Sequence, residues 1–310
     1  MTASEKALRA GRRRGGKIRM TGDQVAVSIF GYLLIGLFAL ICLAPFYLIL
    51  IASFTPENDM IRYGYPIVPG NISTEAYALC VKNPLAILRA YGVTAGVTVV
   101  GTFLAVFLAT MTGYVLSRRD FPWRNGFAFF FFFTTLFSGG LVPWFMLCVR
   151  YLGFKNQIYA LILPLMFSVW NMIIAKSFMA GIPAAITESA KLEGANDFTI
   201  YVRLMIPLSK PLLATLALFS ALAYWNDWYN CMLFMTDDKL FNLQYYLQSM
   251  LGSAEAMRLV AEKSGMDLPA VPLEGMKMAM TVIATGPIVL LYPFLQRYFV
   301  KGLTIGAVKG

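Results

Sequence analysis

Long apolar stretches alternate with short polar segments along this chain of 310 residues. A helix needs about 20 consecutive apolar residues to cross a bilayer, and six stretches reach or approach that length. They cover residues 25–52, 88–116, 126–148, 157–180, 211–234 and 278–296. The pattern predicts an all-α, polytopic membrane protein with six transmembrane helices. One transmembrane domain, 25–296, should lie between a basic segment, 1–24, and a tail, 297–310.

The composition is typical of a membrane protein and argues against histidine-based catalysis and nucleotide binding by this chain. Hydrophobic residues make up 58% of the chain and charged residues 14%, whereas soluble domains usually contain about 25% charged residues. The sequence has no histidine and no G-x-x-x-x-G-K-[S/T] loop that would hold nucleotide phosphates. We therefore expect no catalytic residue, metal site or cofactor in this chain. The cysteines are scattered, and whether Cys80 and Cys148 pair stays open.

Basic residues are distributed unevenly between the segments that connect the apolar stretches. Seven lie in residues 1–24, a run that could contact nucleic acid but more commonly fixes the topology of the following span. With six spans and a cytoplasmic N-terminus, the inner segments contain 17 Lys and Arg and the outer segments contain 7. This asymmetry follows the positive-inside rule, so we expect both termini in the cytoplasm. The net charge of +10 then needs no nucleic acid partner.

A polar interruption, residues 181–210, separates the fourth and fifth apolar stretches. Pro183 suits the first turn of a helix and Gly194 suits a left-handed residue just after its end, so about three helical turns are predicted between them. The apolar side of this helix should consist of Ile182, Ala185, Ile186, Ser189 and Leu192.

A second short helix should follow, with Asn196 or Asp197 as its cap and its end at Ile206 and Pro207. Its predicted apolar stripe consists of Phe198, Tyr201, Val202 and Met205. The two helices predict a helix–turn–helix at the membrane surface. Such an amphipathic segment could also simply lie in the lipid interface.

Three polar groups interrupt the predicted spans, where polar residues are costly and often functional. They are Ser138, Gly139 and Gly140 in the third span, Trp170 and Asn171 in the fourth, and Trp225, Asn226, Asp227, Trp228 and Asn230 in the fifth. Broken backbone is tolerated in a membrane only where it is buried or lines a cavity. A sugar needs hydrogen-bond partners for its hydroxyls and a flat apolar face for its CH groups, so these groups are candidates for a substrate pathway. The alternative is that they only bind helix to helix.

Helical periodicity makes two further predictions about the spans. Asn226, Asp227 and Asn230 should share one side of the fifth span. In the second span, Gly92 and Gly96 have the spacing that lets two membrane helices pack closely.

The polar interruption resembles a loop of known transporters. Glu188, Ser189 and Ala190, then Gly194, Ile206 and Pro207, are similar to the E-A-A…G…I-x-L-P loop of ABC importer permeases, although Ser189 departs from the first alanine. Further similarity comes from residues 116–122 (LSRRDFP), 137–143 (FSGGLVP) and 296–310. From about Tyr32 onward the chain resembles the type I, maltose-permease-like carbohydrate importers, and in particular the bacterial polysaccharide and oligosaccharide permeases.

This resemblance implies the partners and the role of the loop. The family pairs two related permeases, with two cytoplasmic ATPase subunits that bind ATP and Mg²⁺ and an extracellular solute-binding protein, here expected to be a lipoprotein, in the bacterial cell membrane. The loop would dock on the ATPase through Glu188, Ser189, Ala190, Gly194, Asp197, Ile206 and Pro207. Residues 301–310 are small and basic and begin on the cytoplasmic side by the topology above, so we predict an extended segment that reaches into the ATPases.

Two other functions fit part of the pattern. A secondary transporter or channel would act without an ATPase, but Asp227 is the only clear carboxylate inside a span and the two halves show no convincing repeat. An ABC permease for a non-carbohydrate solute would keep the loop and change only the pathway. The sequence does not identify the sugar, its linkage or its chain length.

Overall fold

The computed structural model describes residues 22–68, 70–264 and 272–289, and within these ranges the chain is helical, without a strand. The first helices are α2 (Gly22–Ser53), α3 (Glu57–Tyr63), α4 (Glu75–Cys80), α5 (Pro84–Ser117), α6 (Arg124–Leu136) and α7 (Leu141–Met146). They are followed by α8 (Val169–Ala180), α9 (Ala184–Leu192), α10 (Asp197–Ile200), α11 (Ile206–Leu208), α12 (Lys210–Trp225), α13 (Tyr229–Phe234) and α14 (Leu243–Ser264). Short 3₁₀ or π-helical segments are η1 (Leu147–Tyr151), η2 (Ile158–Leu161), η3 (Leu163–Leu165), η4 (Tyr201–Met205) and η5 (Asp238–Leu240), and a last helix covers 273–289. The predicted all-α class is confirmed.

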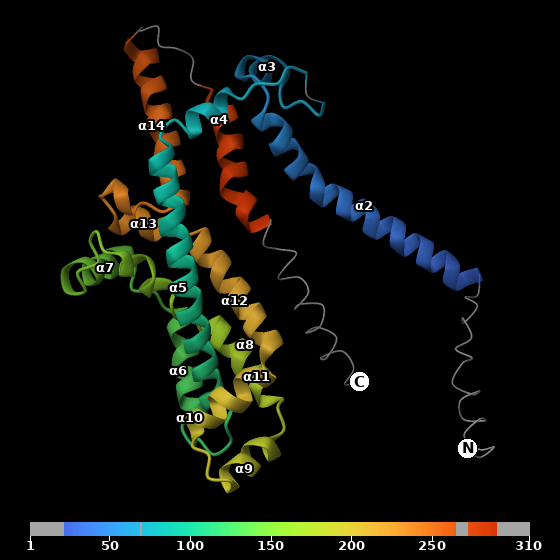
Figure 1. The fold of residues 1–310 in the computed structure, drawn as a ribbon, viewed down its shortest axis with the longest axis vertical. Helices are drawn as coiled ribbons and strands as arrows, with labels where there is room; N and C mark the ends of the chain where they lie inside the picture. The colour runs from blue at the N-terminus through green and yellow to red at the C-terminus, as the bar shows by residue number, and fades with distance from the viewer. Residues whose placement is uncertain (1–21, 69, 265–271, 290–310) are drawn as a thin grey trace, which may run out of the picture.

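Helix α5 is the axis of the molecule and extends through most of its length (Figure 1). Asn83 caps its first turn by accepting a hydrogen bond from the Ala86 amide (3.3 Å), and Pro84 fits the first helical position because its missing N–H is not needed there. Helices α8, α12 and α14 pack against α5. One end of the molecule contains α9 and the other contains α3 and the end of α14, which we call the α9 end and the α3 end.

The glycines that permit close packing of α5 differ from the predicted pair. A Cβ placed on Gly92 or Gly96 would meet nothing within 4 Å beyond its own helical turn among the described residues, so no neighbouring helix approaches closely there. A side chain at Gly101 would instead collide with the ring of Tyr224 at 2.4 Å, and one at Gly113 would meet the Cβ of Ala175 at 2.6 Å. The helix spacing is therefore set further along α5, where α12 and α8 approach it.

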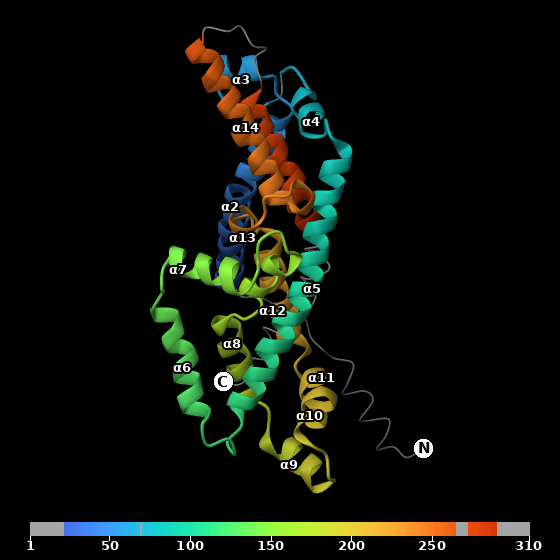
Figure 2. The same cartoon turned by 90° about the vertical axis from the view of Figure 1, so that its left-hand side faces the viewer.

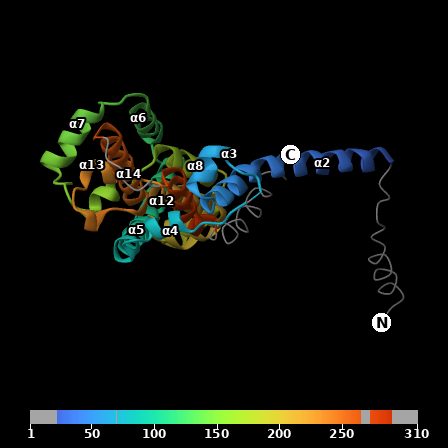
Figure 3. The same cartoon turned by 90° about the horizontal axis from the view of Figure 1, so that it is seen from above.

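Helix α2 confirms the first predicted span but stands away from the other helices (Figure 3). It is 32 residues long, and no residue of its most apolar segment is buried by the residues that the structure describes. An apolar helix that is left uncovered by the described residues is suited to lipid or to another subunit.

Two of the predicted spans are bent. Helix α6 and the α7–η1 segment are bent relative to each other by 112°, and Figure 2 shows α6 and α7 turning away from each other. The η2–η3 segment and α8 are bent by 49°. Gly140, at φ +86°, supplies the turn of the first bend in a conformation that side chains with a Cβ disfavour. The sequence correctly predicts the break at residues 138–140, but the straight spans 126–148 and 157–180 are wrong as single helices.

The fifth predicted span, 211–234, is also interrupted. Helix α12 ends at Trp225 and α13 starts at Tyr229. The carboxylate of Asp227 accepts hydrogen bonds from the amide (3.1 Å) and side chain (3.0 Å) of Asn230, and these local bonds replace the continuous helical ladder. The prediction that Asn226, Asp227 and Asn230 share one helical side is wrong, because no single helix contains them.

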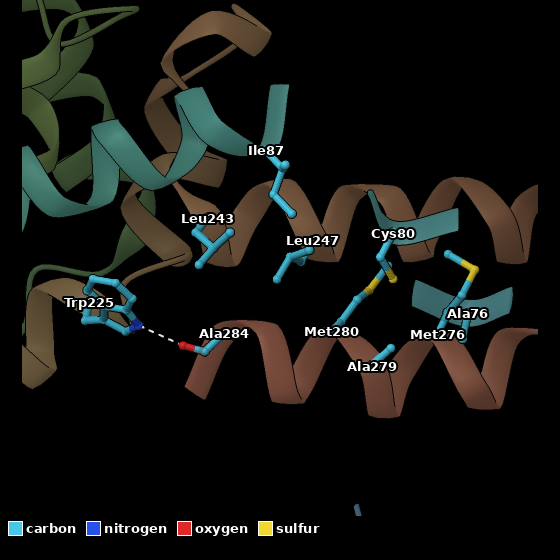
Figure 4. Packing of buried hydrophobic residues seen from close by; sticks show 10 residues of the cluster. All are labelled: Ala76, Cys80, Ile87, Trp225, Leu243, Leu247, Met276, Ala279, Met280 and Ala284. Atoms are coloured by element: carbon cyan, nitrogen blue, oxygen red, sulfur yellow. Dashed lines mark hydrogen bonds between the residues drawn. The ribbon is translucent and has the colours of Figure 1, made fainter. Parts of the chain in front are cut away.

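Helix α14 lies where the sequence predicts only an outer connecting segment, 235–276. It packs beside helix 273–289, and Figure 4 shows the buried cluster that joins these two helices to α4, α5 and α12. Glu57 of α3 accepts hydrogen bonds from the amides of Glu274 (3.2 Å) and Gly275 (3.1 Å), and so caps the last helix. The predicted sixth span, 278–296, extends beyond the described residues.

Candidate functional site

Helix α9 has defined boundaries. Pro183 precedes it with extended backbone (φ −56°, ψ 129°). At the other end Gly194 lies at φ +82°, its amide donates to the Lys191 carbonyl (3.0 Å), and the Ala195 amide donates to the Ala190 carbonyl (3.0 Å). This pair of bonds is a Schellman motif, which satisfies carbonyls that a helix end leaves free. The predicted left-handed glycine is confirmed.

The exposed side of α9 differs from the prediction. Leu192, predicted on the packed apolar side, is 90% exposed, and Ala185 and Ser189 are exposed with it. Ala190 is the buried residue of this helix, in a cluster with Tyr114 and Tyr201. A short helix does not reveal from its own sequence which side its neighbours cover. The outward side thus combines small residues, a leucine and, one turn before Leu192, the exposed carboxylate of Glu188.

The second helix of this region is longer than predicted. Asn196 is its cap and accepts from the Thr199 amide (2.8 Å). The helix then continues through η4 and α11 to Leu208, because the turn before Pro207 widens to i→i+5 bonding, which accommodates a residue without an N–H. The predicted stop at Ile206 and Pro207 is wrong. The predicted apolar stripe is half right, since Tyr201 and Met205 are buried and the other two members, Phe198 and Val202, are exposed.

Charged side chains join this region to the loop after α5. Arg118 donates to the carboxylates of Asp120 and Asp197, and the ammonium of Lys191 lies 2.7 Å from an oxygen of Asp120. Hydrogen bonds from Arg118 and then from Lys191 hold the pKa of Asp120 well below its usual range, so this carboxylate is ionised at neutral pH. A cavity of about 460 Å³ lies beside these residues, between the end of α5, the end of α8 and α9.

Several predicted pathway residues have structural contacts. The indole N–H of Trp225 donates to the Ala284 carbonyl (3.0 Å) in the cluster of Figure 4. Asn171 is buried and donates to the hydroxyl of Ser220 (3.3 Å), and Asn230 is buried against Asp227. Of the residues predicted for the pathway in this group, these contacts leave Asn226 and Trp228 exposed, and the neighbouring Tyr229 is exposed as well.

The remaining predicted pathway residues lie on open surfaces of this chain. Trp170 is 68% exposed at the start of α8. Ser138, Gly139 and Gly140 are exposed at the α6–α7 bend, where the Gly140 amide donates to the Ser138 hydroxyl (3.2 Å). Neither of these two groups lines the cavity that contains Asn226 of the 225–230 group.

A second cavity, of about 480 Å³, lies at the break between α12 and α13, and we call it the amide cavity. It is lined by Asn226, Gln244, Leu247, Gln248, Leu251, Lys277, Met280, Thr281, Ala284 and Thr285. The side-chain amide of Gln244 donates to the side-chain oxygen Oδ1 of Asn226 (3.3 Å). Lys277 is paired with Glu255 (3.4 Å) and Glu274 (3.0 Å), so its charge is compensated.

Of the residues that line the amide cavity, only Asn226 is among the pathway residues predicted from the sequence. A usable signal was present, because Gln244 and Gln248, and likewise Lys277, Thr281 and Thr285, repeat every fourth residue and therefore follow one side of a helix. Cys80 and Cys148 are free and buried in different clusters, so they do not pair. The C-terminal tail, for which contact with ATPases is predicted, lies outside the described residues.

Comparison with known proteins defines the class. The family described as binding-protein-dependent transport system inner membrane component matches residues 101–305, more than half of the chain. The chain belongs to this family, whose members are permease subunits of ABC transporters. It is therefore a membrane protein and a transport subunit.

Individual relatives cover nearly the whole chain. The polygalacturonan/rhamnogalacturonan transport system permease protein YtcP of Bacillus subtilis (strain 168) is 38% identical over 282 residues, which are 91% of this chain and 97% of YtcP. Protein LplC of the same organism is 37% identical over 284 residues, or 91% of this chain and 95% of LplC. A solved chain of a bacterial ABC transporter involved in the import of the acidic polysaccharide alginate has a TM-score of 0.74 and 26% identity, covering 90% of this chain and 99% of its own length. The protein has the fold of an ABC importer permease.

Proposed function

We propose that this permease moves an oligosaccharide, or a fragment of a polysaccharide, into a bacterial cell at the expense of ATP hydrolysed by partner subunits. The names of the relatives support a carbohydrate, since they refer to polygalacturonan, rhamnogalacturonan and alginate. Within this chain, the main support for a carbohydrate substrate is the amide cavity.

The lining of the amide cavity suits sugar hydroxyls. Asn226, Gln244 and Gln248 provide amide donors and acceptors, and Thr281 and Thr285 provide hydroxyls. Apolar side chains such as Leu247 lie between them, as is usual for sites that bind small molecules. Trp228 lies two residues from Asn226 and offers an exposed ring. The polar bend at Ser138, Gly139 and Gly140, together with Trp170 and Asn171, Trp225, Asp227 and Asn230, would line or support other parts of the pathway.

Helix α9 would dock on an ATPase subunit. Its outward side consists of small residues with the exposed carboxylate of Glu188, which permits close approach and offers an ion pair to a basic residue of the ATPase. Gly194 would fix the angle between α9 and the following helix, and Ser189, Asp197, Ile206 and Pro207 would complete the docking region. Ala190 is buried within this chain, so it would support the docking region from beneath rather than touch the ATPase. ATP and Mg²⁺ would be bound by two such ATPase subunits.

A second, homologous permease would complete the membrane part. No residue in the most apolar segment of α2 is buried by the described part of the chain, which supports a further subunit and lipid as its surroundings. An extracellular solute-binding protein, anchored as a lipoprotein, would deliver the sugar at the α3 end. The α9 end and both termini would then lie in the cytoplasm.

Reconstitution tests this function against the alternatives. The complex should be purified with its permease and ATPase partners and placed in vesicles with the binding protein outside. We expect uptake of oligogalacturonides or other oligosaccharides that requires ATP on the α9 side. Uptake driven by an ion gradient without an ATPase would support a secondary transporter instead. Uptake of amino acids or peptides, without any oligosaccharide, would support a non-carbohydrate permease.

A further inference from the structure

Four charged side chains form one network between the α5–α6 loop and the turn that joins α9 to α10. Arg118 donates to Asp120 and Asp197, and Lys191 lies 2.7 Å from Asp120 and 3.9 Å from Asp197. We propose that this network, the ionic link, transmits the movement of docked α9 to α5 during transport. The proposal rests on the proposed function, because it requires α9 to dock on an ATPase.

The ionic link holds both ends of the turn. Lys191 lies in the last turn of α9 and Asp197 in the first turn of α10, and each charge also suits the helix end on which it lies. Residues 192–196 between them are exposed or only partly buried. A movement of this turn relative to α5 must therefore either displace Arg118 or break its ion pairs.

Arg118 directly follows α5 and is more buried than Asp120, Lys191 and Asp197. Its side chain is only 15% exposed, its guanidinium donates to the Tyr114 hydroxyl (3.1 Å), and it lies 5.6 Å from the centre of the Tyr114 ring. Tyr114 in turn stacks on Tyr201 of η4, with ring centroids 5.6 Å apart. A planar guanidinium held in this way can bind two carboxylates in a defined geometry.

Helix α5 connects the ionic link to the amide cavity. It is one helix of 34 residues. At its far half, the hydroxyl of Thr94 accepts a hydrogen bond from the Leu243 amide (2.7 Å) at the start of α14. The next residue, Gln244, lines the amide cavity and binds Asn226. A displacement of Arg118 along α5 would thus reach the cavity through contacts that are all within this chain.

The ionic link is suited to rearrangement rather than to holding the fold together. The side chains of Asp120, Lys191 and Asp197 are 53%, 42% and 63% exposed. Ion pairs between exposed side chains contribute little to stability, because water screens them and ordering the side chains costs entropy. Removing Lys191 or Asp120 should therefore leave folding and assembly intact.

The test measures coupling in the reconstituted complex. Lys191→Gln and Asp120→Asn should each lower the sugar taken up per ATP hydrolysed by about fivefold, the low end of typical coupling between sites. The double variant should lose no more than either single variant, because both remove the same interaction. Lys191→Arg should retain the wild-type ratio. Arg203→Gln is the matched control, since Arg203 is an exposed basic residue of the same region without an ion pair among the described residues.

The outcomes separate this proposal from the proposed function. Wild-type amounts of complex, with the lowered ratio confined to the ionic-link variants, support the ionic link. An unchanged ratio in Lys191→Gln and Asp120→Asn would overturn it, as would additive losses, an equal loss in Arg203→Gln, or a complex that no longer contains its ATPases. If the wild-type complex takes up no oligosaccharide when it hydrolyses ATP, the proposed function itself is wrong. That outcome is distinct from a failure of the ionic-link variants in a complex that does transport.

Discussion

At the scale of single residues, backbone requirements are easier to predict from sequence than contacts are. Gly194 follows a short helix and Gly140 lies in a Ser-Gly-Gly break, and both have positive φ. The contacts of Trp225 and Asn171 depend on residues 59 and 49 positions away, which no local pattern reveals. A tryptophan beside an asparagine inside a span therefore predicts a pathway and a packing contact equally well.

Gly194 permits a sharp test of the α9 geometry. A Cβ at this position would meet no atom within 4 Å, so only the left-handed backbone opposes substitution. The left-handed conformation costs about 1–2 kcal/mol for residues with a Cβ, and asparagine tolerates it better than β-branched residues do. We expect Gly194→Val to reach the membrane in normal amounts but to lose ATPase binding and uptake, while Gly194→Asn keeps both. Co-purification and uptake assays measure this, and full uptake by the valine variant would contradict the docking role.

The two asparagines near the helix break should behave differently. Asn226 is exposed in the amide cavity, whereas Asn230 is buried against the Asp227 carboxylate. Loss of a buried partner leaves a polar group unsatisfied and costs about 1–3 kcal/mol. Asn230→Ala should therefore lower the amount of protein in the membrane. Asn226→Ala and Trp228→Ala should leave that amount and the basal ATPase rate unchanged but reduce uptake, and degradation of both variants would show that these residues are structural.

At the scale of helices, hydropathy predicts which segments enter the membrane but not where they bend. Helices α2 and α5 have the predicted extent because long apolar runs have few other stable structures in a bilayer. Helix α14 was not predicted, because it is amphipathic and its charged residues Glu255, Arg258 and Glu262 lower its hydropathy below that of a span. Its stability comes from packing on helix 273–289, which hydropathy does not reveal. The bends near residues 138 and 226 depend on side-chain bonds to nearby amides, which hydropathy does not record.

The contact between α5 and α14 can be tested at Thr94, with Thr98 of the same helix as the control position. Thr94 accepts from the Leu243 amide, whereas the hydroxyl of Thr98, one turn further along α5, is buried without a partner among the described residues. Thr94→Val should destabilise the folded state by about 1–3 kcal/mol, because the Leu243 amide loses its acceptor, and thermal unfolding of the purified complex should show the loss. Thr98→Val should be neutral or stabilising, because the substitution keeps the shape and removes an unsatisfied hydroxyl. Equal effects of the two substitutions would show that the Thr94 bond does not hold α14.

At the scale of the whole molecule, charge and shape point to the same orientation. The α9 end belongs to the segments that carry the excess of Lys and Arg, and α3 and the end of α14 lie at the opposite end (Figure 1). Positive charge on one side of a membrane protein fixes its orientation during insertion. The alternation of the predicted spans already places the segment of α3 and the segment of α9 on opposite sides of the membrane, and the fold shows these two helices at opposite ends of the molecule (Figure 1).

Thiol labelling tests this orientation directly. Tyr63 of α3 is 81% exposed and Leu192 of α9 is 90% exposed, so cysteines at these positions would be accessible to water-soluble reagents. Cys42 is the exposed native cysteine among the described residues and should be replaced by serine in the starting protein. A membrane-impermeant maleimide added to intact cells should then label Tyr63→Cys but not Leu192→Cys, and permeabilised cells should label both. Labelling of Leu192→Cys in intact cells would place α9 outside, where it could not meet an ATPase that uses cytoplasmic ATP.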